Sequence, residues 1–175
     1  SSGVLLSDGF LSRFTYRNAV ALAVSIGALE WADAFIEHYK KYLPKEQQES
    51  MYSFSRARLA YEKGHYGDVL QLLQRANYKD LLLNLAAKTL LQKTLYVTGA
   101  WDALESQLDA MTSFLARKDI LTYHRNNYRN FAALLKKILA LNPHLPSAKE
   151  TLRAKIEQTQ PLTEKQWLLE QLWKA

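Results

Sequence analysis

The sequence predicts an all-α fold built from repeated helical hairpins. Its 175 residues include only 6 Gly and 4 Pro, and the β-branched residues are scattered, which favours long helices joined by short turns. Gly27, Gly64 and Gly99 each end one apolar-faced segment and precede another. Glycine readily takes the left-handed conformation that closes a helix, so each marks a turn between two antiparallel helices. We expect no β-strands.

The helical segments follow in order along one domain of residues 1–175. They are hairpins at 10–44, 46–76 and 80–117, a long helix at 119–141 and a C-terminal cap at 146–175. Asp8, Asp80 and Asp119 are predicted N-caps, because a carboxylate there accepts hydrogen bonds from the free amides of the first turn. The cap holds two short helices, opened by capping-box patterns at Ser147 and Thr163.

Tryptophan and leucine form apolar stripes at helical spacing, and we assign them to the core. These tryptophans are Trp31, Trp101, Trp167 and Trp173. In the last helix, Trp167 and Trp173 share a stripe with Leu168 and Leu172, which is predicted to cover the open end of the helical stack.

The spacing of the three turns indicates a repeat. Gly27, Gly64 and Gly99 are 37 and 35 residues apart, close to the period of about 34 residues of the tetratricopeptide repeat. Small or apolar residues stand where that family packs helices closely, although Gln92 replaces a small residue in the third unit. They are Val20, Ala32, Ile36, Ala57, Tyr61, Val69, Leu73, Ala76, Tyr96, Leu104 and Leu108.

On these residues, the chain resembles the tetratricopeptide repeat family over residues 10–117. Segments such as TYRNAVALA, NNYRNF and TEKQWLLEQL are also similar to the C-terminal part of uncharacterised bacterial helical-repeat proteins. The resemblance implies an αα-superhelix of tetratricopeptide-like hairpins with a C-terminal helical cap. It implies no activity.

In that family, the first helix of each hairpin lines a concave groove that holds a partner segment. By this register, the groove positions are Phe14, Arg17, Ala21, Val24, Met51, Phe54, Arg58, Tyr61, Ala86, Thr89, Lys93 and Tyr96. The candidate binding residues among them are three cations and three aromatics: Arg17, Arg58 and Lys93 with Phe54, Tyr61 and Tyr96. Such a groove suits a carboxylate or an acidic peptide. The asparagines of the co-chaperone carboxylate clamp have no counterpart here, and solvated surface cations are the alternative reading.

A second group of cations lies between residues 117 and 137, where six Lys or Arg accompany Asp119 alone. Arg125, Arg129 and Lys136 fall near one face of the predicted helix and form a candidate basic patch for phosphates or an acidic partner. The alternative is that these arginines are solvated and the neighbouring polar residues bond across a helix contact.

Composition narrows the class of protein. The chain has no Cys, which excludes disulfides and thiolate metal sites and fits a cytoplasmic location. Its net charge of +6 is modest for a dedicated nucleic-acid binder. The longest apolar runs are too short to span a bilayer, and no signal peptide is recognisable at the start. The lack of an initiator Met leads us to expect a piece of a longer protein.

No linear motif for catalysis is present. The four His lie in different segments without metal-binding spacing, and neither a Gly-rich phosphate loop nor a G-x-S-x-G elbow occurs. Two acidic stripes are assigned to solvated helix faces: Glu30, Asp33 and Glu37, and Asp102, Glu105 and Asp109. We therefore expect no enzyme activity, no metal and no cofactor.

The predicted function is a non-catalytic protein-interaction module, a scaffold or adaptor that receives a partner segment in its groove. Two alternatives remain open. One is a structural C-terminal cap of a longer solenoid, which exposed apolar surface around Phe10, Phe14 and Val20 would favour. The other is nucleic-acid binding through the basic helix at 117–137.

Overall fold

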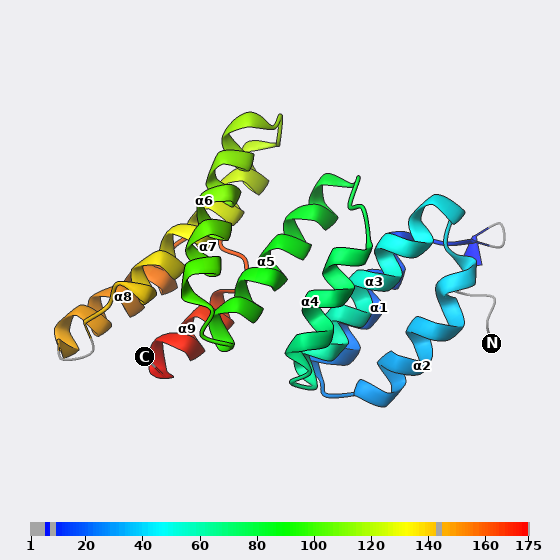
Figure 1. Ribbon diagram of the computed structural model, residues 1–175, viewed down its shortest axis with the longest axis horizontal. Helices are drawn as coiled ribbons and strands as arrows, with labels where there is room; N and C mark the ends of the chain where they lie inside the picture. The colour runs from blue at the N-terminus through cyan, green and yellow to red at the C-terminus, as the bar shows by residue number, and fades with distance from the viewer. Residues whose placement is uncertain (1–5, 8–9, 143–144, 175) are drawn as a thin grey trace. The chain divides into compact units, whose positions relative to one another are not determined.

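The computed structural model describes residues 6–7, 10–142 and 145–174, and almost all of its regular structure is helical (Figure 1). The exception is an antiparallel strand pair, β1 (Leu6–Ser7) with β2 (Phe10–Leu11). The prediction of no strands is therefore wrong at the amino end, where the Leu11 side chain is fully buried and anchors an extended segment. Asp8, the predicted N-cap, lies outside the described residues. Ser12 caps the first helix, since its Oγ accepts a 3.2 Å hydrogen bond from the Phe14 amide.

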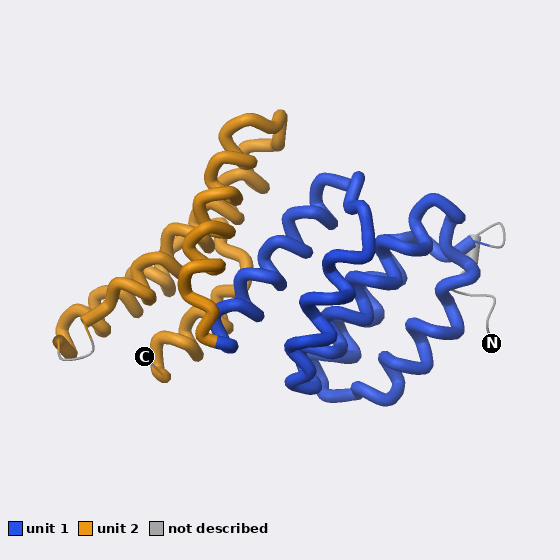
Figure 2. The backbone as a smooth tube through the Cα atoms, in the orientation of Figure 1, with its two compact units in different colours: residues 1–98 blue, residues 99–175 orange. Residues whose placement is uncertain are grey.

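The chain divides into two compact units, residues 1–98 and 99–175, which are described separately (Figure 2). The helices of unit 1 are α1 (Arg13–Ser25), α2 (Leu29–Tyr39), the 3-10 helix η2 (Lys40–Tyr42), α3 (Lys45–Glu62), α4 (Tyr66–Arg75) and α5 (Leu81–Val97). α1 packs on α2 and α3 packs on α4, so both hairpins form. α3 also contacts α1, α2 and α5, and α4 contacts α5.

The turns and the packing positions of unit 1 agree with the sequence. Gly27 and Gly64 have φ of +75° and +76°, so both close their helices in the left-handed region. Asp80 is the N-cap of α5, because its Oδ1 accepts a 2.9 Å hydrogen bond from the Leu83 amide. Most positions expected to pack closely are buried, among them Val20, Ala32, Ile36, Ala57, Val69 and Leu73, whereas Ala76 and Tyr96 are half-buried. Gln92 is also fully buried.

Unit 2 holds α6 (Trp101–Arg117), α7 (Thr122–Leu139), α8 (Pro146–Gln158) and α9 (Lys165–Lys174). α7 contacts α6, α8 and α9, and α8 packs on α9. Three expected caps are wrong, the last being Thr163, because α9 begins two residues after it. α7 begins three residues after Asp119, with Leu121 at its N-cap. α8 begins at Pro146, whose fixed φ suits a first helical position, so Ser147 lies inside the helix.

The tryptophans do not all belong to the core. Trp167 is buried and its ring lies 6.2 Å from that of Phe131, centroid to centroid. Trp31, Trp101 and Trp173 are about half exposed or more, so the core assignment is wrong for these three. The Trp31 ring stacks on that of Phe35 at 4.8 Å, and the Arg153 guanidinium lies 5.7 Å from the centroid of the Trp173 ring.

Among the helices of the described residues, none is both long and apolar enough to cross a lipid bilayer.

Candidate interaction surface

The predicted groove cations lie on three helices that pack in succession. Arg17 is on α1, Arg58 on α3 and Lys93 on α5, and α3 contacts both of the other helices. On α3, Met51, Arg58 and their neighbours share one stripe at helical spacing. We name the stripe of Met51, Phe54, Arg58 and Tyr61 the α3 stripe.

The amino end of the α3 stripe meets α1. Met51 lines a small cavity of about 20 Å³ together with Phe14 and Arg17 of α1 and the first residues of α5. An ion pair joins the same helices, since Arg13 Nη1 lies 2.7 Å from Oδ2 of Asp80. Asp80 therefore caps α5 and neutralises Arg13, which leaves Arg17 as the cation of this cavity.

The carboxyl end of the α3 stripe meets α5. The Lys93 Nζ lies 4.8 Å from the centroid of the Tyr61 ring, within the range of a cation–π interaction. Lys93 is only 8% exposed, and both Phe54 and Tyr61 are buried. Tyr96 is half-buried, and burial raises the pKa of its hydroxyl.

The three cations thus differ in what they offer to a ligand. Arg17 and Arg58 are half-buried, and their side chains make no ion pair or hydrogen bond with any residue that the structure describes. Lys93 is committed to the Tyr61 ring, and the aromatic residues serve mainly as packing. Arg17 of α1 lies near Met51 at one end of the α3 stripe and Lys93 of α5 near Tyr61 at the other, so Arg17 and Arg58 are the half-buried guanidinium groups at or beside this stripe.

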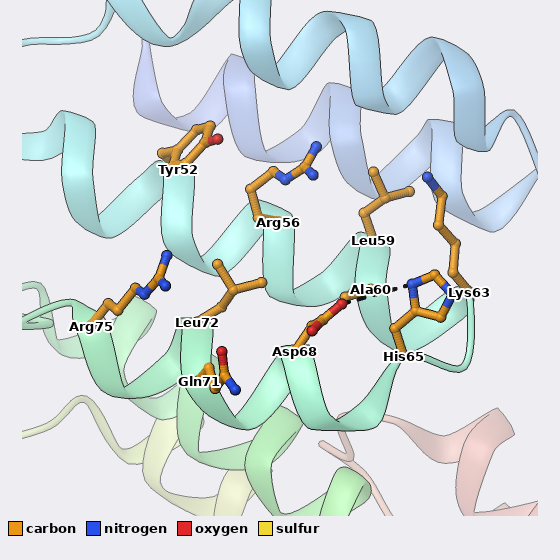
Figure 3. A pocket seen from close by; sticks show the side chains of 10 residues that line it. All are labelled: Tyr52, Arg56, Leu59, Ala60, Lys63, His65, Asp68, Gln71, Leu72 and Arg75. Carbon is orange, nitrogen blue, oxygen red and sulfur yellow. Dashed lines mark ion pairs between the residues drawn. The ribbon is translucent and has the colours of Figure 1, made fainter.

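A second concave surface, not found from the sequence, lies between α3 and α4 (Figure 3). Its volume is about 450 Å³, with Leu59, Ala60 and Leu72 among apolar lining residues. The polar lining residues are Tyr52, Arg56, Lys63, His65, Asp68, Gln71 and Arg75. The α3 members repeat at helical spacing, which is the signal that could have identified this face.

The charges of this pocket are largely satisfied by α2. Asp33 forms ion pairs with Arg56 and with Lys63, whose Nζ lies 3.0 Å from Oδ2. The Tyr52 hydroxyl donates a 2.7 Å hydrogen bond to Glu37. Lys63 and Arg56 hold the pKa of the Asp33 carboxyl below its usual value. The prediction of a solvated acidic face on α2 is wrong for Asp33 and Glu37, which form the polar contact with α3, whereas Glu30 is exposed as expected.

The predicted basic patch on α7 is partly occupied by internal contacts. Arg125 donates a 3.2 Å hydrogen bond to the carbonyl of Lys118, and Lys136 forms an ion pair with Asp109 of α6. Arg129 is exposed and has no partner among the described residues. One of the three cations therefore stays fully available.

Within the part of the chain that the structure describes, no three His, Asp or Glu side chains come together as a set that could hold a metal ion. Comparison with protein-family models, with curated proteins and with solved structures finds no match.

Proposed function

We propose that this all-α protein is a non-catalytic interaction module that binds an acidic partner segment along the α3 stripe. The observation that carries the proposal is the pair of half-buried guanidinium groups, Arg17 and Arg58, without partners among the described residues. A guanidinium can grip a carboxylate with two parallel hydrogen bonds, and partial burial strengthens such a contact.

Capture from a cell lysate tests this function. The protein is used as bait in nuclease-treated and untreated lysate, alongside the double variant R17A/R58A. A matched control, R75A/R129A, removes the same charge at two exposed arginines that also lack partners in the described structure. We expect a protein partner that survives nuclease, is lost with R17A/R58A and is kept with R75A/R129A. Capture that is indifferent to R17A/R58A would contradict the proposal.

A second candidate function is that of an end piece which stacks against further helical repeats. It is favoured by the apolar exposure at the amino end of the described chain, where Phe10 of β2 and Phe14 of α1 are both more than half exposed. Val20, also expected there, is buried against the rest of unit 1. Nucleic-acid binding through α7 has less support, because internal contacts occupy Arg125 and Lys136. Capture that vanishes with nuclease and with the R75A/R129A control would identify it.

A further inference from the structure

The outer face of α1 is apolar and open to solvent. We define this face by Phe14, Asn18, Leu22 and Ile26. The exposed fractions of the three apolar side chains are 53%, 64% and 71%, in that order. Single exposed apolar residues are ordinary, but three on one side of a 13-residue helix form a patch.

Three of the four positions are buried in the next hairpin, and the fourth, Lys63 at the position of Ile26, is exposed. Alignment of Gly27 with Gly64 places Met51 at the position of Phe14 and Leu59 at that of Leu22. Met51 and Leu59 are 3% and 2% exposed, and Ser55, at the position of Asn18, is buried too. Alignment of Gly27 with Gly99 carries the pattern to α5, where Leu90 and Thr94 occupy the positions of Asn18 and Leu22 and are buried.

The preceding hairpin contacts this side of α3. Met51 faces the cavity lined by Phe14 and Arg17 of α1. Tyr52, Arg56 and Lys63 of α3 bond to Glu37 and Asp33 of α2. The side of α3 that contacts the preceding hairpin therefore corresponds, position by position, to the outer face of α1. On α1 this side has no hairpin packed on it among the described residues.

The chemistry of the outer face specifies what fits on it. Ile26 stands where α3 has Lys63, and Thr15 and Ala19 stand where α3 has Tyr52 and Arg56. None of these three residues carries a charge that could pair with a carboxylate, and only Thr15 has a side-chain hydrogen-bond donor. A helix like α2 would therefore leave Asp33 and Glu37 without the ion pairs that they form with α3, at a cost in partial desolvation.

We propose that the outer face of α1 is a docking surface for an amphipathic helical hairpin whose facing helix is apolar where α2 carries Asp33 and Glu37. This inference rests on the second proposed function, stacking against further repeats. Phe14, at one edge of this face, lines the same cavity as Arg17, but the test below uses Leu22 and leaves Arg17 and Arg58 unchanged.

A duplicated hairpin provides the test. Residues 8–44 are repeated in tandem within the full chain, so that an added hairpin precedes α1 at the native spacing. The added copy carries Asp33→Leu and Glu37→Leu. Because the chain has no Cys, Leu22→Cys in the second copy is a unique reporter, and its rate of labelling by a thiol reagent measures exposure. Ser25→Cys is the matched control, since Ser25 and its α3 counterpart Glu62 are both exposed.

We expect labelling of the Leu22→Cys reporter to slow at least tenfold relative to the same reporter in the original chain. The Ser25→Cys control should change less than twofold. An added copy that retains Asp33 and Glu37 should protect the reporter less. Equal labelling in the original and duplicated chains would overturn the proposal, as would an added hairpin that gains no helical circular dichroism signal.

The original chain, without the added hairpin, tests whether a second copy of the protein binds to the outer face of α1 instead. If labelling of its Leu22→Cys reporter slows as protein concentration rises, and Leu22→Asp abolishes a dimer in sedimentation, the face binds a second copy and the hairpin assignment is overturned. We expect labelling to be independent of concentration. The capture assay with R17A/R58A can fail without affecting any of these results, so the two proposals are tested separately.

Discussion

The Lys93 Nζ lies 4.8 Å from the centroid of the Tyr61 ring and ties α5 to α3 near their carboxyl ends. At the other end of the α3 stripe, Met51 shares a cavity with Arg17 of α1. These two contacts fix the registers of α1 and α5 on α3, and Arg58 lies between them on the same stripe. The proposed binding surface along α3 therefore depends on how the hairpins pack.

Two tyrosine hydroxyls differ in their hydrogen bonding. The Tyr16 hydroxyl donates a 3.0 Å hydrogen bond to the carbonyl of Ile36, whereas the buried Tyr78 hydroxyl has no partner among the described residues. Tyr16→Phe should lower the free energy of unfolding by about 1–2 kcal/mol, because it removes a buried hydrogen bond between α1 and α2. Tyr78→Phe should be neutral or stabilising by up to about 1 kcal/mol. Urea unfolding measures both, and equal losses would contradict the assignment.

Gly64 and Gly67 separate backbone strain from packing. A Cβ added at either residue meets nothing within 4 Å, but only Gly64 has a positive φ, +76°. Gly64→Ala should therefore cost on the order of 1 kcal/mol. Gly67→Ala, inside α4, should stabilise by up to about 0.5 kcal/mol, because alanine loses less backbone entropy. Thermal unfolding of both variants tests the turn, and an unchanged stability of Gly64→Ala would show that it is not left-handed.

Asp33 should make stability depend on pH. Its pKa is lowered from 3.8, chiefly by the hydrogen bond from Lys63 and also by Arg56, so its contribution is complete above that value and is lost as pH falls through the lower pKa of the folded state. Asp33→Asn should cost about 1 kcal/mol at pH 7, as expected for partly exposed ion pairs. The difference from wild type should shrink below about pH 4. Asp119→Asn, at an exposed carboxylate without a described partner, is the control. A difference that persists at pH 2 would refute this role.

The last helix should stabilise unit 2 through its buried leucine. Leu168 is fully buried and Trp173 is largely exposed on the same helix. Leu168→Ala should lower the free energy of unfolding by about 2–5 kcal/mol, because it leaves a cavity. Trp173→Ala removes a larger side chain but should cost less than about 1 kcal/mol. Chemical denaturation of the two variants measures this contrast, and the reverse order would show that Trp173 seals the unit.

The sequence predicted the helices of this chain well where local signals were strong. Gly27 and Gly64 placed two turns, because only glycine adopts their φ without strain. The predicted caps at Asp119 and Ser147 are wrong because each helix begins at a different residue close by. α7 begins at Thr122 and α8 begins at Pro146. Local capping patterns do not reveal which of several adjacent starts the packing selects.

The sequence predicted which residues of the candidate site share a helix face, but not which of their side chains are buried. Periodicity placed Arg58 and Tyr61 on one stripe, as the structure does. It did not reveal that Lys93 is buried on the Tyr61 ring, since that contact depends on the distance between α3 and α5. It also missed that Asp33 pairs with Lys63, because the pairing joins residues that are 30 positions apart. Such contacts belong to the tertiary packing.

A direct titration tests the central claim, that Arg17 and Arg58 bind an acidic segment. Fluorescein-labelled hexaglutamate is titrated with protein and followed by fluorescence anisotropy, with hexaglutamine as the neutral control. We expect saturable binding of hexaglutamate alone, weakened at least tenfold by R17A/R58A and changed less than threefold by R75A/R129A. Equal weakening by both double variants would show that net charge, and not the α3 stripe, binds the peptide, and would contradict the proposed function.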